Sequence, residues 1–371
     1  MAVRSEERPQ RRPMKLPFWL QRLLLSKELG LLLLLAAVVA FFYNQVEAAQ
    51  QTRVYFDVAR EVSPNVIAMI GVAMLILAGE FDLSVGSMLA VSGVTTVSVF
   101  NATDSMYAGI AAGLATGPLV GSIHGYLVTV VGMNSLVTTL GSMFALRGLV
   151  YVYTNQTPVV DENRFRLFEV LYHDELHTWL CRVGLFGEES SVCARVVGAA
   201  ARNLPWWKQV PLPAMIALLL VLFFTFIMTQ TEFGRRVYAI GGNATAARVS
   251  GIKVARTKFL LFVNSSTLAA FAGVMLAAQT GSGYFDAGST GFELLVIAAT
   301  VLGGVSLAGG QGNLIGALLG VLILGMTSKG MRLMALNTNY QLIVIGVVML
   351  AAVFMHDFRR RLDDLRKRWE R

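Results

Sequence analysis

The chain has 371 residues, of which 55% are hydrophobic and only 15% are charged. An ordinary soluble domain carries about 25% charged residues, and a chain with so few charges cannot hide this much apolar surface from water. The composition therefore excludes most soluble enzyme folds and predicts a protein whose solvent is the lipid bilayer. At about 20 residues per transmembrane helix, the length allows about ten spans, one sizeable loop and two short tails.

Ten apolar windows follow one another along the chain. They cover residues 29–43, 62–79, 85–100, 107–131, 135–153, 212–229, 258–279, 292–308, 313–328 and 340–355. Basic residues precede the first window, as in a secretory signal peptide, but no small-x-small cleavage site follows it, so we expect an uncleaved span. We predict an all-α polytopic membrane protein with about ten transmembrane helices.

Basic residues gather in three segments, which indicate how the chain crosses the membrane. Segments 1–28, 230–258 and 356–371 carry net charges of +4, +5 and +3, while the whole chain carries +8. Lys and Arg near span ends stay on the cytoplasmic side, so we expect both termini and the 230–258 loop to be cytoplasmic. Lys329 and Arg332 fall on the opposite side in this scheme. The basic residues flank apolar spans, which favours anionic lipid over nucleic acid as their partner.

The loop 154–211 is the one stretch long enough to form a small external element. It contains Cys181 and Cys193, which could form a disulfide on an oxidising outer face or remain two free thiols. His173 and His177 have the i, i+4 spacing of a zinc-binding helix. A clear third ligand is missing, so the pattern favours an amphipathic surface helix over a metal site.

Glycines recur every fourth residue in two windows. Such small-residue faces let helices approach closely in lipid, and we expect them to be helix-packing positions. They are Gly113, Gly117, Gly121 and Gly125 in the fourth window, and Gly312, Gly316 and Gly320 at the ninth.

The two glycine rows belong to a longer internal repeat. Residues 117–125 (GPLVGSIHG) match 312–320 (GNLIGALLG), and residues 79–82 (GEFD) match 283–286 (GYFD), which precede the rows in the same order. Spans two to five therefore resemble spans seven to ten. Five spans separate the copies, so their orientations in the membrane are opposite. An inverted repeat is typical of alternating-access transporters.

Ionisable residues within or beside spans are candidates for the transport path, because they are costly to desolvate. Glu80, Asp82 and Glu293 are the acidic candidates, while Arg147 could instead extend toward lipid headgroups. Neutral hydrogen-bonding groups occur at Asn134 and, a turn later, at Thr138 and Thr139. Neutral groups of this kind suit a hydroxylated, uncharged substrate.

The chain carries no visible energy source of its own. It has no G-x-x-x-x-G-K-[ST] phosphate-binding loop. In the 230–258 loop, residues 241–243 could cap a helix that places Ala244, Ala247, Arg248 and Gly251 on one face. Such a small-residue helix could sit in a groove of a cytoplasmic partner, or it could be a solvated connector.

Several stretches of this chain closely resemble the ribose-type permeases, the membrane subunits of bacterial ABC importers for monosaccharides. The resemblance rests on residues 234–243 (GRRVYAIGGN), 246–252 (AARVSGI), 79–87 (GEFDLSVGS), 139–143 (TLGSM) with Arg147-Gly148, and 302–312 (LGGVSLAGGQG). It covers most of residues 60–355.

The resemblance implies the domain organisation, partners and site residues. It implies a permease domain over residues 29–355 in the bacterial inner membrane, and two copies of the chain would pair as a homodimer. A periplasmic sugar-binding protein would deliver the cargo, and a separate cytoplasmic ATPase would drive transport. The chain itself would bind no cofactor and catalyse no reaction, because ATP and Mg²⁺ are used by the ATPase. The ATPase-docking helix would comprise Gly242, Asn243, Ala246, Ala247, Arg248, Gly251 and Ile252. Asp82, Ser84 and Gly86 match a family motif that lines or shapes the path.

Three departures from the family pattern leave the cargo open. Glu80 replaces a usual Gly, His124 replaces a usual Asn, and Leu295 stands where the family has an Asp. The leading prediction is import of a pentose or hexose, and the alternative is a nucleoside or a signalling furanose on the same scaffold. An intramembrane enzyme using His124, Asp82 or His173 is disfavoured, because these residues lack nucleophile–base spacing.

Overall fold

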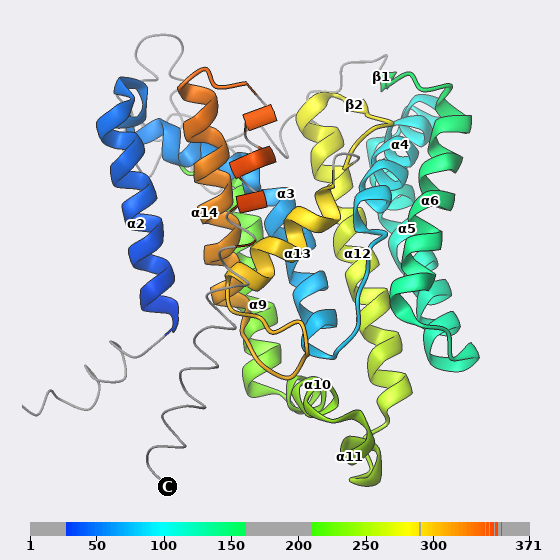
Figure 1. The fold of residues 1–371 in the computed structure, drawn as a ribbon. Coiled ribbons are helices and arrows are strands. Elements are labelled where there is room, and N and C mark those ends of the chain that lie inside the picture. Colours follow the sequence, from blue (N-terminus) through cyan, green and yellow to red (C-terminus); the bar gives the residue numbers. More distant parts are fainter. Residues whose placement is uncertain are drawn as a thin grey trace, which may run out of the picture.

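The computed structural model describes residues 27–160 and 209–337, apart from residues 289 and 290, and parts of 339–350. The segments 1–26 and 351–371, most of the loop 154–211 and part of the tenth window lie outside the described residues. Cys181, Cys193, His173 and His177 lie there too. The described part is a bundle of helices with one two-stranded antiparallel sheet (Figure 1).

Eight described helices are long and apolar enough to cross a membrane. They are α2 (Lys27–Gln45), α3 (Thr52–Leu77), α4 (Val85–Thr103), α5 (Met106–Tyr126, extended by the π-helical turn η2 at Leu127–Val131), α6 (Ser135–Thr154), α9 (Leu212–Gln230), α12 (Val254–Thr280) and α14 (Leu314–Leu333). The shorter elements are η1 (Glu47–Gln50), β1 (Val159–Val160), α10 (Glu232–Gly242), α11 (Ala244–Val249), β2 (Ser282–Gly283) and α13 (Phe292–Leu302). The all-α polytopic fold is confirmed.

Two predicted boundaries differ most from the structure. Helix α3 begins at Thr52, ten residues before the predicted start, because its first turns carry charged residues that an apolar window excludes. Helix α13 ends at Leu302, not at residue 308. Glycines with left-handed φ angles, among them Gly304 at +89° and Gly309 at +83°, turn the chain out of the helix there. At about 1.5 Å per residue, α13 crosses only about half of the hydrocarbon core.

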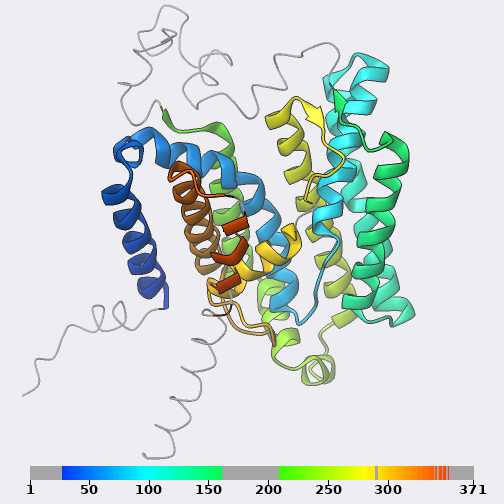
Figure 2. The same ribbon diagram turned by 45° about the horizontal axis from the view of Figure 1, so that its top comes forward.

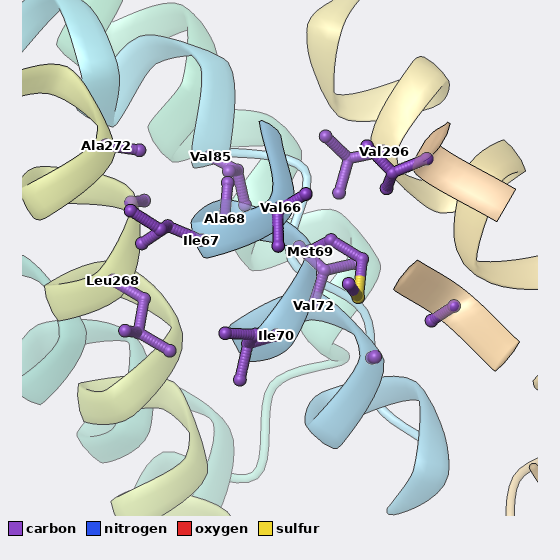
Figure 3. Close-up of a cluster of buried hydrophobic side chains, with 14 of the residues drawn as sticks. Val66, Ile67, Ala68, Met69, Ile70, Val72, Val85, Leu268, Ala272 and Val296 are labelled. Atoms are coloured by element: carbon purple, nitrogen blue, oxygen red, sulfur yellow. The ribbon is translucent and has the colours of Figure 1, made fainter. Parts of the chain in front are cut away.

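Helix α3 is the centre of the bundle. It contacts α12, α14, α9 and α13, and every residue from Val66 to Leu77 is buried. Figure 3 shows its side chains between Leu268 and Ala272 of α12 on one side and Val296 of α13 on the other. A helix that is apolar all round belongs in a protein interior, which explains why α3 lacks the polar face of a surface helix.

The two halves of the bundle run in opposite directions, as the inverted repeat predicts. Helix α3 ends beside α10, whereas α12 begins beside α11 and ends at β2 (Figures 1 and 2). Each of these long helices leads into a non-helical segment and then into another helix. The two non-helical segments, 78–84 and 284–288, therefore start from opposite ends of the bundle. We call these ends the α10–α11 end and the β1–β2 end.

The basic residues that conflicted with the charge pattern are neutralised by an acidic partner. Lys329 and Arg332, in the last turns of α14, both form ion pairs with Glu61 of α3. Because Glu61 cancels one of these two positive charges, the local net charge at the end of α14 is lower than a count of its basic residues suggests. Their position is therefore a weaker argument about orientation than the exposed basic residues of the 230–258 loop.

The glycine rows lie at close helix contacts. A Cβ atom added to Gly113 would lie 1.9 Å from Thr96 Oγ1 of α4, and one added to Gly121 would lie 2.6 Å from Val263 Cα of α12. Gly117 and Gly125 also approach α12, while Gly316 and Gly320 approach the carbonyl oxygens of Gly303 and Ala299. Gly312 has φ +124° and packs on Val305. A side chain at these positions would push the helices apart.

Candidate functional site

A cavity of about 600 Å³ opens at the α10–α11 end of the bundle. It lies between the 78–84 segment, the end of η2, the start of α6, α11 and the start of α12. Its lining residues are Gly79, Glu80, Phe81, Val128, Thr129, Met133, Asn134, Ser135, Leu136, Val137, Arg248, Val254, Ala255 and Lys258. Charged, amide and hydroxyl groups thus alternate with apolar side chains. That mixture suits a ligand with both hydroxyl groups and apolar faces.

An ion pair crosses one wall of this cavity. Lys258 Nζ of α12 donates a hydrogen bond to Glu80 Oε1 of the 78–84 segment. The two side chains are only 19% and 12% exposed, so the charges are largely removed from water and each depends on the other. The pair ties the 78–84 segment to the helix that directly follows α11.

Asp82 lies behind the cavity wall and does not line the cavity. Its side chain is 1% exposed. Oδ1 accepts hydrogen bonds from the backbone N–H (2.9 Å) and the hydroxyl (2.5 Å) of Ser84, and Oδ2 accepts one from Ser265 Oγ of α12 (3.0 Å). Three donors to one buried carboxylate form a satisfied polar network. Asp82 and Ser84 therefore join the start of α4 to the middle of α12.

The start of α6 provides the neutral polar groups of the cavity. Asn134 is the N-cap of α6, where its Oδ1 accepts from the N–H groups of Leu136 (3.0 Å) and Val137 (3.3 Å). Thr138, predicted beside it, donates its hydroxyl to the carbonyl of Asn134 (2.8 Å) and is not a lining residue. Ser135, which the sequence analysis did not single out, lines the cavity.

Glu293 does not line the cavity but lies against the start of α4. It is in the first turn of α13, and its Oε2 would lie 2.6 Å from a Cβ atom added to Gly86 in the first turn of α4. Gly86 also approaches the carbonyl of Gly288 so closely that a Cβ atom there would lie 2.5 Å from the oxygen. The starts of α4 and α13, and with them the 284–288 segment, therefore meet inside the bundle.

His124 is buried against an aromatic ring of α12. It is 1% exposed, its ring meets Phe262 edge-on at 6.5 Å, and its Nδ1 has no hydrogen-bond partner within the described residues. The same part of the chain contains no group of three His, Cys, Asp or Glu side chains that could hold a metal ion.

Helices α10 and α11 form a compact unit at their end of the bundle. Thr231 caps α10, and Asn243 caps α11 by accepting from the N–H of Ala246 (2.9 Å). The expected capping role for residues 241–243 is thus confirmed at Asn243. Arg248 and Val249 are exposed beside it, and Val249 is 85% exposed.

The expected single face of Ala244, Ala247, Arg248 and Gly251 was wrong. Helix α11 ends at Val249, and Ala247 is buried while Arg248 is exposed. Gly251 has φ +84°, and the N–H groups of Gly251 and Ile252 donate to the carbonyls of Arg248 and Ala247. This pair of bonds is a Schellman motif. Gly251 therefore ends the helix, and Ile252 packs back on the protein.

The α10–α11 unit is joined tightly to the bundle. Gly310 N–H donates to the carbonyl of Leu77, the last residue of α3 (2.9 Å). A Cβ atom added to Gly241 would lie 1.8 Å from that same oxygen and 2.5 Å from Gly310 N. Tyr238 donates its hydroxyl to the carbonyl of Gly312 (2.9 Å), and burial raises the pKa of this phenol. These contacts connect α10 to the end of α3 and to the start of α14.

Some of these functional contacts had no clear signal in the sequence. Lys258 looked like one more basic residue of the loop, and Ser265 lies in an apolar run. Val249 stands out only in the structure, as a strongly exposed apolar side chain next to Arg248.

Comparison with known proteins identifies the family. The model of the family described as "Branched-chain amino acid transport system / permease component" matches residues 54–353. The chain belongs to this family. Among its relatives, the permease is 35% identical to the L-arabinose transport system permease protein of Escherichia coli (strain K12), over 81% of each chain. It is 36% identical to the ribose import permease protein of the same strain, over 81% of the permease and 84% of that relative.

A relative from a second organism is similar at the same level. The permease is 34% identical to the ribose import permease protein of Bacillus subtilis (strain 168), over 81% of the permease and 83% of that relative. No solved structure matches. The matched region includes the cavity, the buried Asp82 network and the α10–α11 unit of the permease.

Proposed function

We propose that this chain is the membrane subunit of an ATP-driven, binding-protein-dependent importer that carries a monosaccharide, a pentose or a hexose, by alternating access. The observation that carries the proposal is the similarity over about four fifths of the chain to permeases named for ribose and L-arabinose. The cavity supports it. Glu80, Lys258, Asn134 and Ser135 provide donors and acceptors for hydroxyl groups, and Phe81 provides an apolar face for a sugar ring.

The energy for transport comes from a cytoplasmic ATPase that docks on α11. The sequence has no phosphate-binding loop. Arg248 and Val249 present a charged and an apolar group side by side. A partner's push on α11 reaches α3 and the segment before α14 through the contacts of Gly241 and Tyr238. ATP and Mg²⁺ bind the partner, not this chain.

The α10–α11 end faces the cytoplasm, and a periplasmic sugar-binding protein delivers cargo at the β1–β2 end. The exposed Arg235, Arg248 and Lys253 at the α10–α11 end support this orientation in the bacterial inner membrane. Helix α2 begins at the same end, since Asn313 Nδ2 donates to Glu28 Oε1. Two copies of the chain pair as a homodimer around the path.

Uptake by reconstituted vesicles tests this function. The permease is combined with the ATPase and the binding protein encoded beside its gene, and ATP-dependent uptake of radiolabelled D-ribose, L-arabinose, D-galactose and adenosine is measured. We expect uptake of one of the three sugars. Uptake of adenosine alone would support a nucleoside importer, and ATP-independent uptake would contradict the ATP-driven model.

A double variant that makes the exposed surface of α11 acidic tests whether it is the docking surface. Arg248→Glu with Val249→Glu should abolish both ATPase association and uptake while leaving the amount of permease in the membrane unchanged. Arg53→Glu is the matched control, because Arg53 is an exposed arginine at the β1–β2 end. Loss of association in the control, or full association in the double variant, would show that α11 is not the docking surface.

A further inference from the structure

One ridge of α6 holds the 78–84 segment and the 284–288 segment. Five residues spaced four apart make these contacts, and residues at this spacing form a ridge that winds slowly around the helix. We call them the α6 ladder: Ser135, Thr139, Met143, Arg147 and Tyr151. The ladder spans about 24 Å at 1.5 Å per residue.

The first two residues of the ladder bind the 78–84 segment. The backbone N–H of Phe81 donates to Ser135 Oγ (3.4 Å), and that of Leu83 donates to Thr139 Oγ1 (3.0 Å). A non-helical backbone at membrane depth has lost its own helical partners, and an unpaired N–H there is costly. The two hydroxyls of α6 supply the missing acceptors.

The next two residues hold the start of α4 and the 284–288 segment. Ser87 Oγ donates to the carbonyl of Met143 (2.8 Å). Arg147 Nη1 donates to the carbonyls of Ala287 (2.6 Å) and Phe285 (3.4 Å). One guanidinium nitrogen that donates to two carbonyls of the same non-helical segment restrains the path of that segment.

The last residue of the ladder holds a side chain of the same segment. Tyr151 donates its hydroxyl to Asp286 Oδ1 (2.7 Å), and its ring meets Phe285 edge-on at 5.8 Å. Beyond it, the strand β1 that follows α6 pairs with β2, with Val159 opposite Gly283. Residues 285–287 are therefore attached to α6, and the strand β2 just before them is attached to the continuation of α6.

Much of the α6 surface outside the ladder makes few contacts. Val137, Phe144 and Val152 are 61%, 67% and 79% exposed. The position of α6 in the chain is thus set mainly by the ladder. Because Val137 also lines the cavity, a movement of α6 changes the cavity at one end and the 284–288 segment at the other.

We propose that α6 is a rigid link that moves the 78–84 and 284–288 segments together, with Arg147 and Tyr151 as positioning residues for the 284–288 segment. This assigns Arg147 a role inside the protein instead of at the lipid headgroups. The link itself is independent of the cargo, and its role in transport rests on the proposed function.

Cysteine accessibility in the permease alone tests the link. Cys181 and Cys193 are replaced by serine, and single cysteines are placed at Tyr284→Cys, in the held segment, or at Val137→Cys, in the cavity wall. The rate of labelling by a charged maleimide is compared between chains with Arg147 and with Arg147→Ala. We expect labelling at position 284 to rise roughly tenfold, the factor expected for losing a hydrogen bond from a charged donor. Labelling at position 137 should change severalfold as well.

The labelling rate at position 137 distinguishes a rigid link through α6 from a local contact of Arg147. Position 137 lies about 15 Å from position 147 along α6, so a change there requires α6 to move as a body. A change at position 284 alone would overturn the link and leave Arg147 a local contact, and no change at either position would overturn both roles. Leu149→Ala is the matched control on the exposed face of α6 (62% exposed) and should alter neither rate.

Two further variants guard against simple misfolding. Arg147→Lys keeps one charged donor and should restore labelling part of the way, whereas Tyr151→Phe should raise labelling at position 284 by a smaller factor than Arg147→Ala. If Arg147→Lys is labelled at position 284 as fast as Arg147→Ala, and the amount of permease in the membrane also falls, the variants have a general folding defect. That result would count against a positioning role. In the reconstituted importer, Arg147→Ala should retain ATP hydrolysis but lose most uptake; loss of both activities would point instead to failed assembly.

Discussion

The hydroxyl of Tyr238 donates to the carbonyl of Gly312 at 2.9 Å, and so ties the surface helix α10 to the residue that leads into α14. This single bond joins the predicted coupling loop to one of the two glycine rows. It lies next to the contacts of Gly241 with Leu77 and Gly310. The α10–α11 unit is therefore part of the bundle and not a flexible appendage.

Removing the Tyr238 hydroxyl should weaken this junction. We expect Tyr238→Phe to lower the free energy of unfolding by about 1 kcal/mol, the usual value of one neutral hydrogen bond, and to reduce uptake per ATP hydrolysed. Thermal unfolding in detergent and coupled uptake measure the two effects. An unchanged coupling ratio would contradict a role in transmission.

The pH dependence of this contact has a definite sign. Burial raises the pKa of Tyr238 above the ordinary value of 10.0 for a tyrosine, and the phenol donates only when it is protonated. The stabilising contribution is therefore fully present below pH 10 and is lost only as the pH rises through the raised pKa. The stability difference between wild type and Tyr238→Phe should be constant at all pH values below 10; a difference that falls near neutral pH would contradict this.

A methyl group at Gly241 should separate the α10–α11 unit from the bundle. Its Cβ would lie 1.8 Å from the carbonyl oxygen of Leu77, which is backbone and cannot swing aside. We expect Gly241→Ala to abolish most uptake while the ATPase still binds to α11. Gly141→Ala, in α6, is the control, because no atom lies within 4 Å of its added Cβ. Equal uptake by the two variants would show that the close contact is not needed for coupling.

The Glu80–Lys258 pair should respond cooperatively to substitution. Each single variant, Glu80→Gln or Lys258→Met, leaves one largely buried charge without its partner and should cost roughly 2 kcal/mol of stability. The double variant should cost less than the sum of the two, since it leaves no unpaired charge. A double-mutant cycle from thermal unfolding gives this coupling energy, and strict additivity would mean that the pair does not interact.

Ser265 and Ser266 form a natural pair for testing the Asp82 network. Ser265 donates to the buried carboxylate of Asp82, whereas Ser266 Oγ has no hydrogen-bond partner among the residues that the structure describes. Ser265→Ala should cost about 1.5–3 kcal/mol, as expected for a bond to a charged group, and Ser266→Ala should be nearly neutral. Equal costs for both would show that volume and not the hydrogen bond is what matters there.

The sequence predicted most of the fold because lipid imposes a strong constraint. Long apolar windows and a four-residue glycine period are direct consequences of spanning a membrane and packing within it. The prediction was weakest where the backbone leaves the helix. Helix α13 was predicted six residues too long, because residues 303–308 are apolar or small and only their glycine φ angles end the helix.

The candidate site was predicted only in part, for a related reason. Glu80 and Asn134 line the cavity as expected, but Asp82 and Ser84 lie behind its wall, and Glu293 lies elsewhere. An acidic residue in a span is conspicuous in a sequence, while its partner is not. Lys258 and Ser265 are about 180 residues away from Glu80 and Asp82 along the chain, and only the fold brings each pair together.

The burial of α3 on all sides has a consequence for how the protein is made. Its neighbours α12 and α14 leave the ribosome some 200 residues later, so a newly inserted α3 has no finished interior to enter. Until then its apolar surface is satisfied by lipid, and its close-packing residues, such as Gly71 against Ser265, have no neighbour. Assembly of the centre is thus a late event, and a chain cut between α6 and α9 would leave each half without the other's share of the core.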